Sequence, residues 1–128
     1  FRLKYFSEDM NRRREIANQY DIAFRGNQNI YPPPGPNENE IFYDVYQNYE
    51  ITADKRDELK DYLSKKNIGT LIQWGGKGIH HFQNLGFTQV LPNTDKFFKR
   101  CIMLPINLFI SDDDVDYICK SIKEFYRK

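Results

Sequence analysis

The first apolar pattern along this chain has the period of a helix. From Ser7 to Phe24 apolar side chains recur at close to 3.6 residues, which predicts an amphipathic helix. Ser7 can cap this helix, and Glu8 and Asp9 suit its positive N-terminal end. The predicted buried stripe is Met10, Ile16, Ala17, Tyr20 and Phe24. Arg12, Arg13 and Arg14 are expected on the opposite, exposed side, where basic side chains are usually only solvated.

The next segment, residues 26–40, reads GNQNIYPPPGPNENE and has no apolar period. Three consecutive prolines and Pro36 exclude a regular helix and favour extended backbone. The segment lacks the basic residues that ligands of proline-reading domains often carry. We therefore expect a stiff connecting loop.

Residues 41–51 then alternate strictly, which predicts a long strand. Thr52 to Lys66 returns to a helical pattern, ended near Asn67 and Gly69. Thr70 to Trp74 predicts a short second strand. One face of the long strand would present Ile41, Tyr43, Val45, Tyr49 and Ile51, and the helix would turn Leu59, Tyr62 and Leu63 inward.

The last third of the chain predicts three more elements. A short helix should start near Asn93 or Thr94, and a third strand should run through residues 102–104 and stop at Pro105. Ser111, with Asp114 three residues on, marks the start of the final helix. Its apolar stripe is Val115, Ile118, Cys119, Ile122 and Phe125.

This order of elements predicts an α/β fold, a small two-layer sandwich in which a roughly three-stranded sheet is covered by helices on one face. Because the chain starts with Phe1 and a helical pattern follows almost at once, we expect a piece of a longer protein. Residues 1–26 would be a helix leading in from an absent large domain, and residues 27–128 a small α/β domain. A cleaved precursor is the alternative.

Composition narrows the classes of partner. Nineteen Lys and Arg against 18 Asp and Glu give a net charge of +1, so no global field favours nucleic acid or an anionic membrane. We find neither a run of about 18 apolar residues nor a signal-peptide pattern. The two cysteines, Cys101 and Cys119, lie in apolar runs, which predicts buried, reduced thiols in a cytoplasmic protein.

Common catalytic motifs are absent from the sequence, including phosphate-binding and dinucleotide-binding glycine loops, zinc-protease histidine pairs and nucleophile elbows. A zinc site from His80, His81, Cys101 and Cys119 has the right residue types. However, adjacent histidines on a regular backbone point apart and no other close pair supports them, so we expect no metal site. By motif alone this chain is not a self-contained enzyme.

The stretch IQWGGKGIHHF, residues 72–82, holds most of the unusual chemistry. It gathers the only tryptophan, three glycines, a lysine and both histidines. Candidate binding side chains are Trp74, Lys77, His80 and His81. The alternative is structural, with Trp74 and Ile79 packing and the other three side chains solvated.

Five segments in register resemble one family. They are NRRREIANQYDIAF; YDVYQNYEI with RDELKDYLSKKNIGT; LGF; LPNTDKFF; and IMLPI with SDDDVDYICKSIKEFY. Together they resemble the C-terminal domain of the DegT/DnrJ/EryC1/StrS family, the pyridoxal-phosphate-dependent sugar aminotransferases. The resemblance runs from about Leu3 to Tyr126.

The resemblance implies the small domain of a fold-type I aminotransferase. Such an enzyme moves an amino group from an amino acid, here expected to be glutamate, to a keto-sugar nucleotide for surface-polysaccharide or glycosylated-metabolite assembly. It also implies a homodimer for the full-length protein. The Schiff-base lysine and most contacts to pyridoxal phosphate would lie in the absent domain, so we expect no catalytic residue, no cofactor and no activity in this chain alone. Lys77 lies in a different motif from the Schiff-base lysine of the family, so we do not assign that role to Lys77. The alternative from the residues is a non-catalytic α/β module that binds a partner protein or a small ligand.

The resemblance also implies that residues 72–82 lie near the active-site mouth. Many relatives have His-Tyr-Pro and then Leu-His here, so His80 matches the second histidine and Trp74 replaces the first. Trp74 could pack on a sugar or base, Lys77 could meet a diphosphate, and His80, beside His81, could bond to a hydroxyl. Many relatives also have arginine where this chain has Thr52, and either departure could mark a different sugar.

Overall fold

The structure is a computed structural model that describes residues 2–36 and 43–127. The sheet strands are β1 (Ile30–Tyr31), β2 (Tyr49–Ala53) and β3 (Cys101–Leu104). The α-helices are α1 (Phe6–Phe24), α2 (Arg56–Lys65), α3 (Pro92–Phe98) and α4 (Asp112–Tyr126). Short 3₁₀ turns cover Arg2–Tyr5, Gln73–Gly76, Ile79–His81 and Gln83–Leu85.

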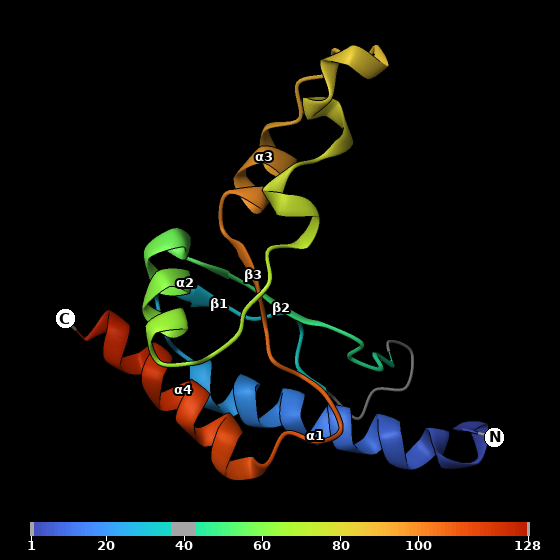
Figure 1. The fold of residues 1–128 in the computed structure, drawn as a ribbon, viewed down its shortest axis with the longest axis vertical. Coiled ribbons are helices and arrows are strands. Elements are labelled where there is room, and N and C mark those ends of the chain that lie inside the picture. The colour runs from blue at the N-terminus through green and yellow to red at the C-terminus, as the bar shows by residue number, and fades with distance from the viewer. Residues whose placement is uncertain (1, 37–42, 128) are drawn as a thin grey trace.

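The three strands form one antiparallel sheet with β2 in the centre (Figure 1). Ile51 of β2 pairs with Ile102 of β3, and Ala53 pairs with Ile30 of β1. Alternate residues of β2 are buried, as expected of a strand with one covered face. Together with the helices described below, this sheet confirms the predicted α/β fold.

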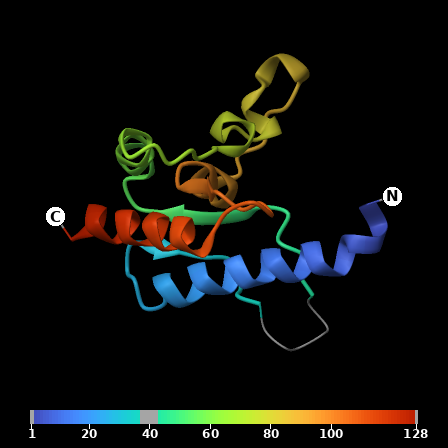
Figure 2. The ribbon, with the colours of Figure 1, turned by 60° about the horizontal axis from the view of Figure 1, so that its bottom comes forward.

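The core lies between that sheet face and the helices α1, α2 and α4. The ring of Tyr20 from α1 packs against the ring of Tyr49 from β2 with centroids 4.9 Å apart, and its hydroxyl donates to the Pro105 carbonyl at 2.7 Å. Figure 2 shows α1 and α4 running along the same side of the sheet. The buried residues that these helices supply are Ile16, Ala17, Tyr20, Phe24, Leu59, Leu63, Val115, Ile118, Cys119 and Ile122.

Helix α4 begins as its sequence predicts. The Asp114 N–H donates to Ser111 Oγ at 3.1 Å, and the Ser111 N–H donates to the Asp114 carboxylate at 3.1 Å. This reciprocal capping satisfies two backbone donors at the helix start. The hydrogen bonds from Ser111 also lower the pKa of Asp114 below its ordinary value.

The three arginines of α1 are not the solvated side chains that the sequence suggests. All three are half-buried and bond to other segments. Arg12 binds the Asp112 carboxylate at 2.9 Å, Arg13 binds the Gln47 carbonyl at 2.9 Å, and Arg14 binds the Asp44 carbonyl at 2.7 Å. Their role here is to attach α1 to residues 43–47 and to the start of α4.

The predicted strand over 41–51 is too long. Residues 41 and 42, like residues 37–40 of the expected loop, lie outside the described residues. Of the rest, only Tyr49 to Ile51 belong to β2, which continues to Ala53. Tyr46 has φ of 47°, which interrupts extended backbone. The segment expected to be irregular supplies β1 instead.

The second predicted strand, Thr70 to Trp74, is reduced to a single bridge between Leu71 and Met103. The helix expected from Thr52 begins at Arg56, because β2 extends to Ala53. Helix α3 begins at Pro92, where a missing N–H costs no hydrogen bond. In the described part of the chain, no helix has the length and apolar character needed to cross a bilayer.

Residues 73–100 form an arm that projects away from the sheet and its helices (Figure 1). It contains α3 and three of the 3₁₀ turns. The structure describes the whole arm, and within it only Gly78 and His80 are buried. The arm is therefore mostly exposed to solvent, and its conformation must be stabilised by contacts among its own residues and at its junction with the sheet.

The two thiols are buried and unpaired, as predicted. Burial raises the pKa of Cys119 to about 12 and also raises the pKa of Cys101. Because the thiolate is the reactive form, we expect neither thiol to react with a thiol reagent at pH 8 until the chain unfolds. Titration of native and guanidinium-unfolded protein with an aromatic disulfide checks this, and fast labelling of both thiols in the native protein would contradict it.

Candidate functional site

The arm begins with a turn in which three successive residues have left-handed backbone. The φ angles are 53° at Trp74, 62° at Gly75 and 73° at Gly76. Glycine adopts these angles readily, whereas a residue with a Cβ does so at a cost of about 1–2 kcal/mol. Trp74 is held in this conformation with its side chain 76% exposed. Backbone strain that presents an aromatic ring to solvent suggests a binding role.

Next to this turn is a hollow of about 430 Å³, which we call the arm hollow. Its volume falls within the range of small-molecule sites. Most of its wall is apolar and comes from the 3₁₀ turns and α3. The lining residues are Trp74, Lys77, Gly78, Ile79, Phe82, Leu85 and Phe98.

Lys77 is the one charged residue that lines the arm hollow in the described structure. Its side chain is exposed, and its N–H donates to the Trp74 carbonyl at 3.2 Å. An apolar wall with an aromatic face and one ammonium group suits a ligand that has both a flat or apolar part and an anionic part.

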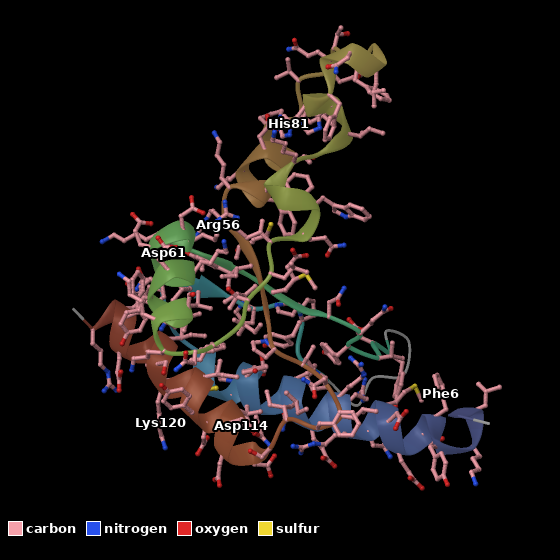
Figure 3. The ribbon with its side chains drawn as sticks, viewed as in Figure 1. Phe6, Arg56, Asp61, His81, Asp114 and Lys120 are labelled. Atoms are coloured by element: carbon pink, nitrogen blue, oxygen red, sulfur yellow. The ribbon has the colours of Figure 1, made fainter. Side chains whose placement is uncertain are left out.

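The two histidines do not line the arm hollow. His80 Nε2 lies 2.7 Å from Asp95 Oδ1, and His81 Nε2 lies 2.7 Å from the same oxygen. The ring centroids are 4.1 Å apart. The expectation that these adjacent histidines point apart is wrong, because they sit on a 3₁₀ turn and α3 presents one carboxylate to both rings. Figure 3 shows His81 beside α3.

The carboxylate that the two histidines share is ionised. The hydrogen bonds from His80 and then His81 hold the pKa of Asp95 below its ordinary value, so Asp95 is ionised at neutral pH. His80 is 8% exposed, and its ring is covered by the arm itself. We call His80, His81 and Asp95 the histidine clamp.

The histidine clamp is also the one group of three or more possible metal ligands within residues 2–36 and 43–127. Its ligand atoms all lie within 4.8 Å of one another. Neither Cys101 nor Cys119 belongs to this group, so the structure does not assemble the combination of two histidines and two cysteines.

The sequence predictions placed Trp74 and Lys77 in a common site but missed several neighbours. Phe82 and Leu85 follow Ile79 at intervals of three, which is the repeat that aligns side chains on a 3₁₀ turn. That spacing was a usable signal. Phe98 and Asp95 had none, because they come from a helix that meets the turn only in the folded arm.

Arg56 fixes the foot of the arm (Figure 3). Its guanidinium donates to the Phe98 carbonyl at 3.2 Å and to the Cys101 carbonyl at 2.9 Å, and to the Asp57 carboxylate at 2.7 Å. These bonds join the start of α2 to the end of α3 and the start of β3. Arg56 therefore holds the arm in place relative to the core.

Comparison with known proteins decides the family. The sequence model of the DegT/DnrJ/EryC1/StrS aminotransferase family matches residues 1–123. This chain belongs to the DegT/DnrJ/EryC1/StrS aminotransferase family.

Two curated relatives and one solved structure are similar to this family member. A pleiotropic regulatory protein of Geobacillus stearothermophilus is 32% identical over 96 residues, covering 72% of this chain and 26% of the relative. The spore coat polysaccharide biosynthesis protein SpsC of Bacillus subtilis is 26% identical, and the match covers 98% of this chain and 34% of SpsC. A DegT/DnrJ/EryC1/StrS aminotransferase from Brucella abortus superposes with a TM-score of 0.82 at 25% identity. The superposition covers 98% of this chain and 33% of the Brucella chain.

The chain thus spans about a quarter to a third of the length of the proteins it matches.

Proposed function

We propose that this chain is the C-terminal domain of an enzyme that transfers an amino group from an amino acid, glutamate, to a keto-sugar nucleotide. In this proposal the arm hollow binds part of the sugar nucleotide in the intact enzyme. The product would enter polysaccharide assembly, the process named for the relative SpsC.

The chemistry of the arm hollow is the observation that supports this proposal. A sugar nucleotide combines flat and apolar surface with a diphosphate, and the arm hollow combines an apolar wall with the ammonium group of Lys77. Trp74 would pack on a base or sugar ring, because its indole is exposed and held outward by the turn. Lys77 would meet the diphosphate as a point charge.

The histidines take a different part in this proposal from Trp74 and Lys77. His80 is buried and its Nε2 is bonded to Asp95, so its direct contact with substrate would be limited to the ring edge. His81 is more exposed, but both of its ring nitrogens are already bonded, Nδ1 to the Gly78 N–H and Nε2 to Asp95. A contact between His81 and a substrate hydroxyl would require one of these bonds to break. We therefore place Trp74 and Lys77 ahead of His80 and His81 as binding residues.

We assign pyridoxal phosphate to the part of the longer protein outside this chain. The lysines of the described residues are exposed or half-buried, which does not fit the enclosed lysine that this cofactor requires. Residues 1–26 would then lead in from that large domain to the small domain, residues 27–128. When bound there, the cofactor supplies the electron sink of the transfer, and this chain supplies substrate binding. The intact enzyme is proposed to be a cytoplasmic homodimer.

The test is Lys77→Ala in the full-length enzyme. We expect the KM for the sugar nucleotide to rise about five- to thirty-fold, corresponding to about 1–2 kcal/mol for one partly exposed charge contact. The kcat should change little, because uniform binding is lost and the chemical step is untouched. Steady-state kinetics at saturating amino donor measure both parameters.

Lys99→Ala is the matched control, since Lys99 is an exposed lysine of the arm that does not line the arm hollow. It should leave the KM unchanged. Trp74→Ala should raise the KM as Lys77→Ala does. If neither Lys77→Ala nor Trp74→Ala moves the KM, the arm hollow does not bind the sugar nucleotide.

A further inference from the structure

The histidine clamp joins two parts of the arm that are far apart in sequence. Asp95 lies in the first turn of α3, whereas His80 and His81 lie 15 and 14 residues earlier. One carboxylate oxygen of Asp95 is the shared acceptor at 2.7 Å from each Nε2. Within the described arm, these two contacts are the side-chain hydrogen bonds that join the Ile79–His81 turn to α3.

The hydrogen bonds fix which ring nitrogen of each histidine carries the proton. The Gly78 N–H donates to His81 Nδ1 at 3.0 Å, so this nitrogen must be the acceptor. Neutral His81 therefore carries its proton on Nε2 and donates it to Asp95. His80 Nε2 faces the same ionised oxygen, which can only accept, so His80 also donates from Nε2.

This tautomer argues against a metal ion at the clamp. A metal would bind the lone pair of Nε2, which requires the proton on Nδ1. In His81 that proton would point at the Gly78 N–H, which lies 3.0 Å away. The arrangement thus fits a carboxylate that receives two N–H groups, and a metal ion could enter only if the Gly78 contact were broken.

The clamp also shapes the wall of the arm hollow. A Cβ added at Gly78 would lie 2.7 Å from His80 Cε1 and 3.0 Å from Phe98 Cε2, so the His80 ring, Gly78 and Phe98 are in close contact. Gly78 and Phe98 both line the arm hollow. Lys77 and Ile79, which also line it, are the neighbours of Gly78 in sequence.

We propose that Asp95 is a positioning residue that holds His80 and His81 in one tautomer and thereby fixes the Lys77–Ile79 wall of the arm hollow for substrate. This inference rests on the proposed function of the arm hollow. Asp95 acts through the two imidazoles and does not touch the substrate.

The first measurement is independent of catalysis. In protein labelled with ¹⁵N-histidine, the His81 signals should show a protonated Nε2 and an unprotonated Nδ1, and the His80 signals a protonated Nε2, with His80→Gln and His81→Gln used for assignment. In Asp95→Ala the His80 signals should move to the averages of freely exchanging imidazole, whereas His81 keeps the Gly78 N–H as a donor to its Nδ1. An unprotonated Nε2 in His81 of the wild-type protein would overturn the proposal, as would stoichiometric binding of added Zn²⁺ that shifts both Nε2 signals.

The second measurement uses the full-length enzyme. Asp95→Ala should raise the KM for the sugar nucleotide at least five-fold with little change in kcat, and Asp95→Glu should recover part of the loss. Asp113→Ala, an exposed carboxylate on α4, is the control and should have no effect.

The two measurements separate the possible failures. If Lys77→Ala raises the KM and Asp95→Ala does not, the arm hollow binds substrate but the positioning role is wrong. If neither variant raises the KM while the ¹⁵N signals behave as expected, the proposed function of the arm hollow has failed, and the positioning role fails with it.

Discussion

Replacing Ile51 with alanine is expected to lower the free energy of unfolding by about 2–5 kcal/mol, because a large buried aliphatic side chain is lost and a cavity remains. Ile51 is fully buried in the central strand, opposite Ile102 of β3. It lies on the sheet face that α1, α2 and α4 cover. Urea unfolding followed by circular dichroism measures the change.

Val90→Ala is the control for Ile51→Ala, since Val90 is 84% exposed on the arm. An exposed substitution of this kind should change the unfolding free energy by no more than about 0.5 kcal/mol. If Ile51→Ala lowers the unfolding free energy no more than Val90→Ala does, burial of Ile51 does not stabilise the fold.

Replacing Arg56 with alanine is expected to lower the free energy of unfolding by about 1.5–3 kcal/mol, the range for hydrogen bonds to a charged group. The Arg56 side chain is only 10% exposed, and its loss leaves the Phe98 and Cys101 carbonyls without this donor. Because both carbonyls lie at the foot of the arm, the arm should also become more susceptible to limited proteolysis. Arg56→Lys should recover little, since an ammonium group does not match the fork geometry of a guanidinium.

Lys60→Ala serves as the control on the same helix, where Lys60 is exposed. It should leave both stability and proteolysis of the arm unchanged. Equal cleavage of the arm in Arg56→Ala and Lys60→Ala would show that Arg56 does not hold the arm.

Local sequence signals were enough to predict those helices and strands whose ends are determined by their own residues. Helix α4 is the clearest case, because Ser111 and Asp114 cap each other and an apolar stripe follows at helical spacing. β3 was also predictable, since Pro105 marks where the strand must stop. α3 was predicted from Asn93 or Thr94 and begins at Pro92. The family followed from five such segments in register.

The sequence could not show which part of the alternating apolar and polar pattern forms a strand. Residues 43–47 alternate as well as β2 does, but Arg13 and Arg14 take the carbonyls of Asp44, Tyr46 and Gln47. Those arginines come from α1, roughly 30 residues away in sequence. β1 was missed for the converse reason, since two residues become a strand only because β2 is beside them to pair.

For the candidate site too, part of the information came from the sequence and part only from the tertiary structure. Sequence alone identified residues 72–82 and marked Trp74, Lys77, His80 and His81, because their residue types are unusual together. Only the tertiary structure separated them into two groups, with Trp74 and Lys77 on the arm hollow and the histidines on Asp95. The physical reason is that a side chain's partner depends on which distant segment folds against it, and here α3 brings both Phe98 and Asp95 to the turn.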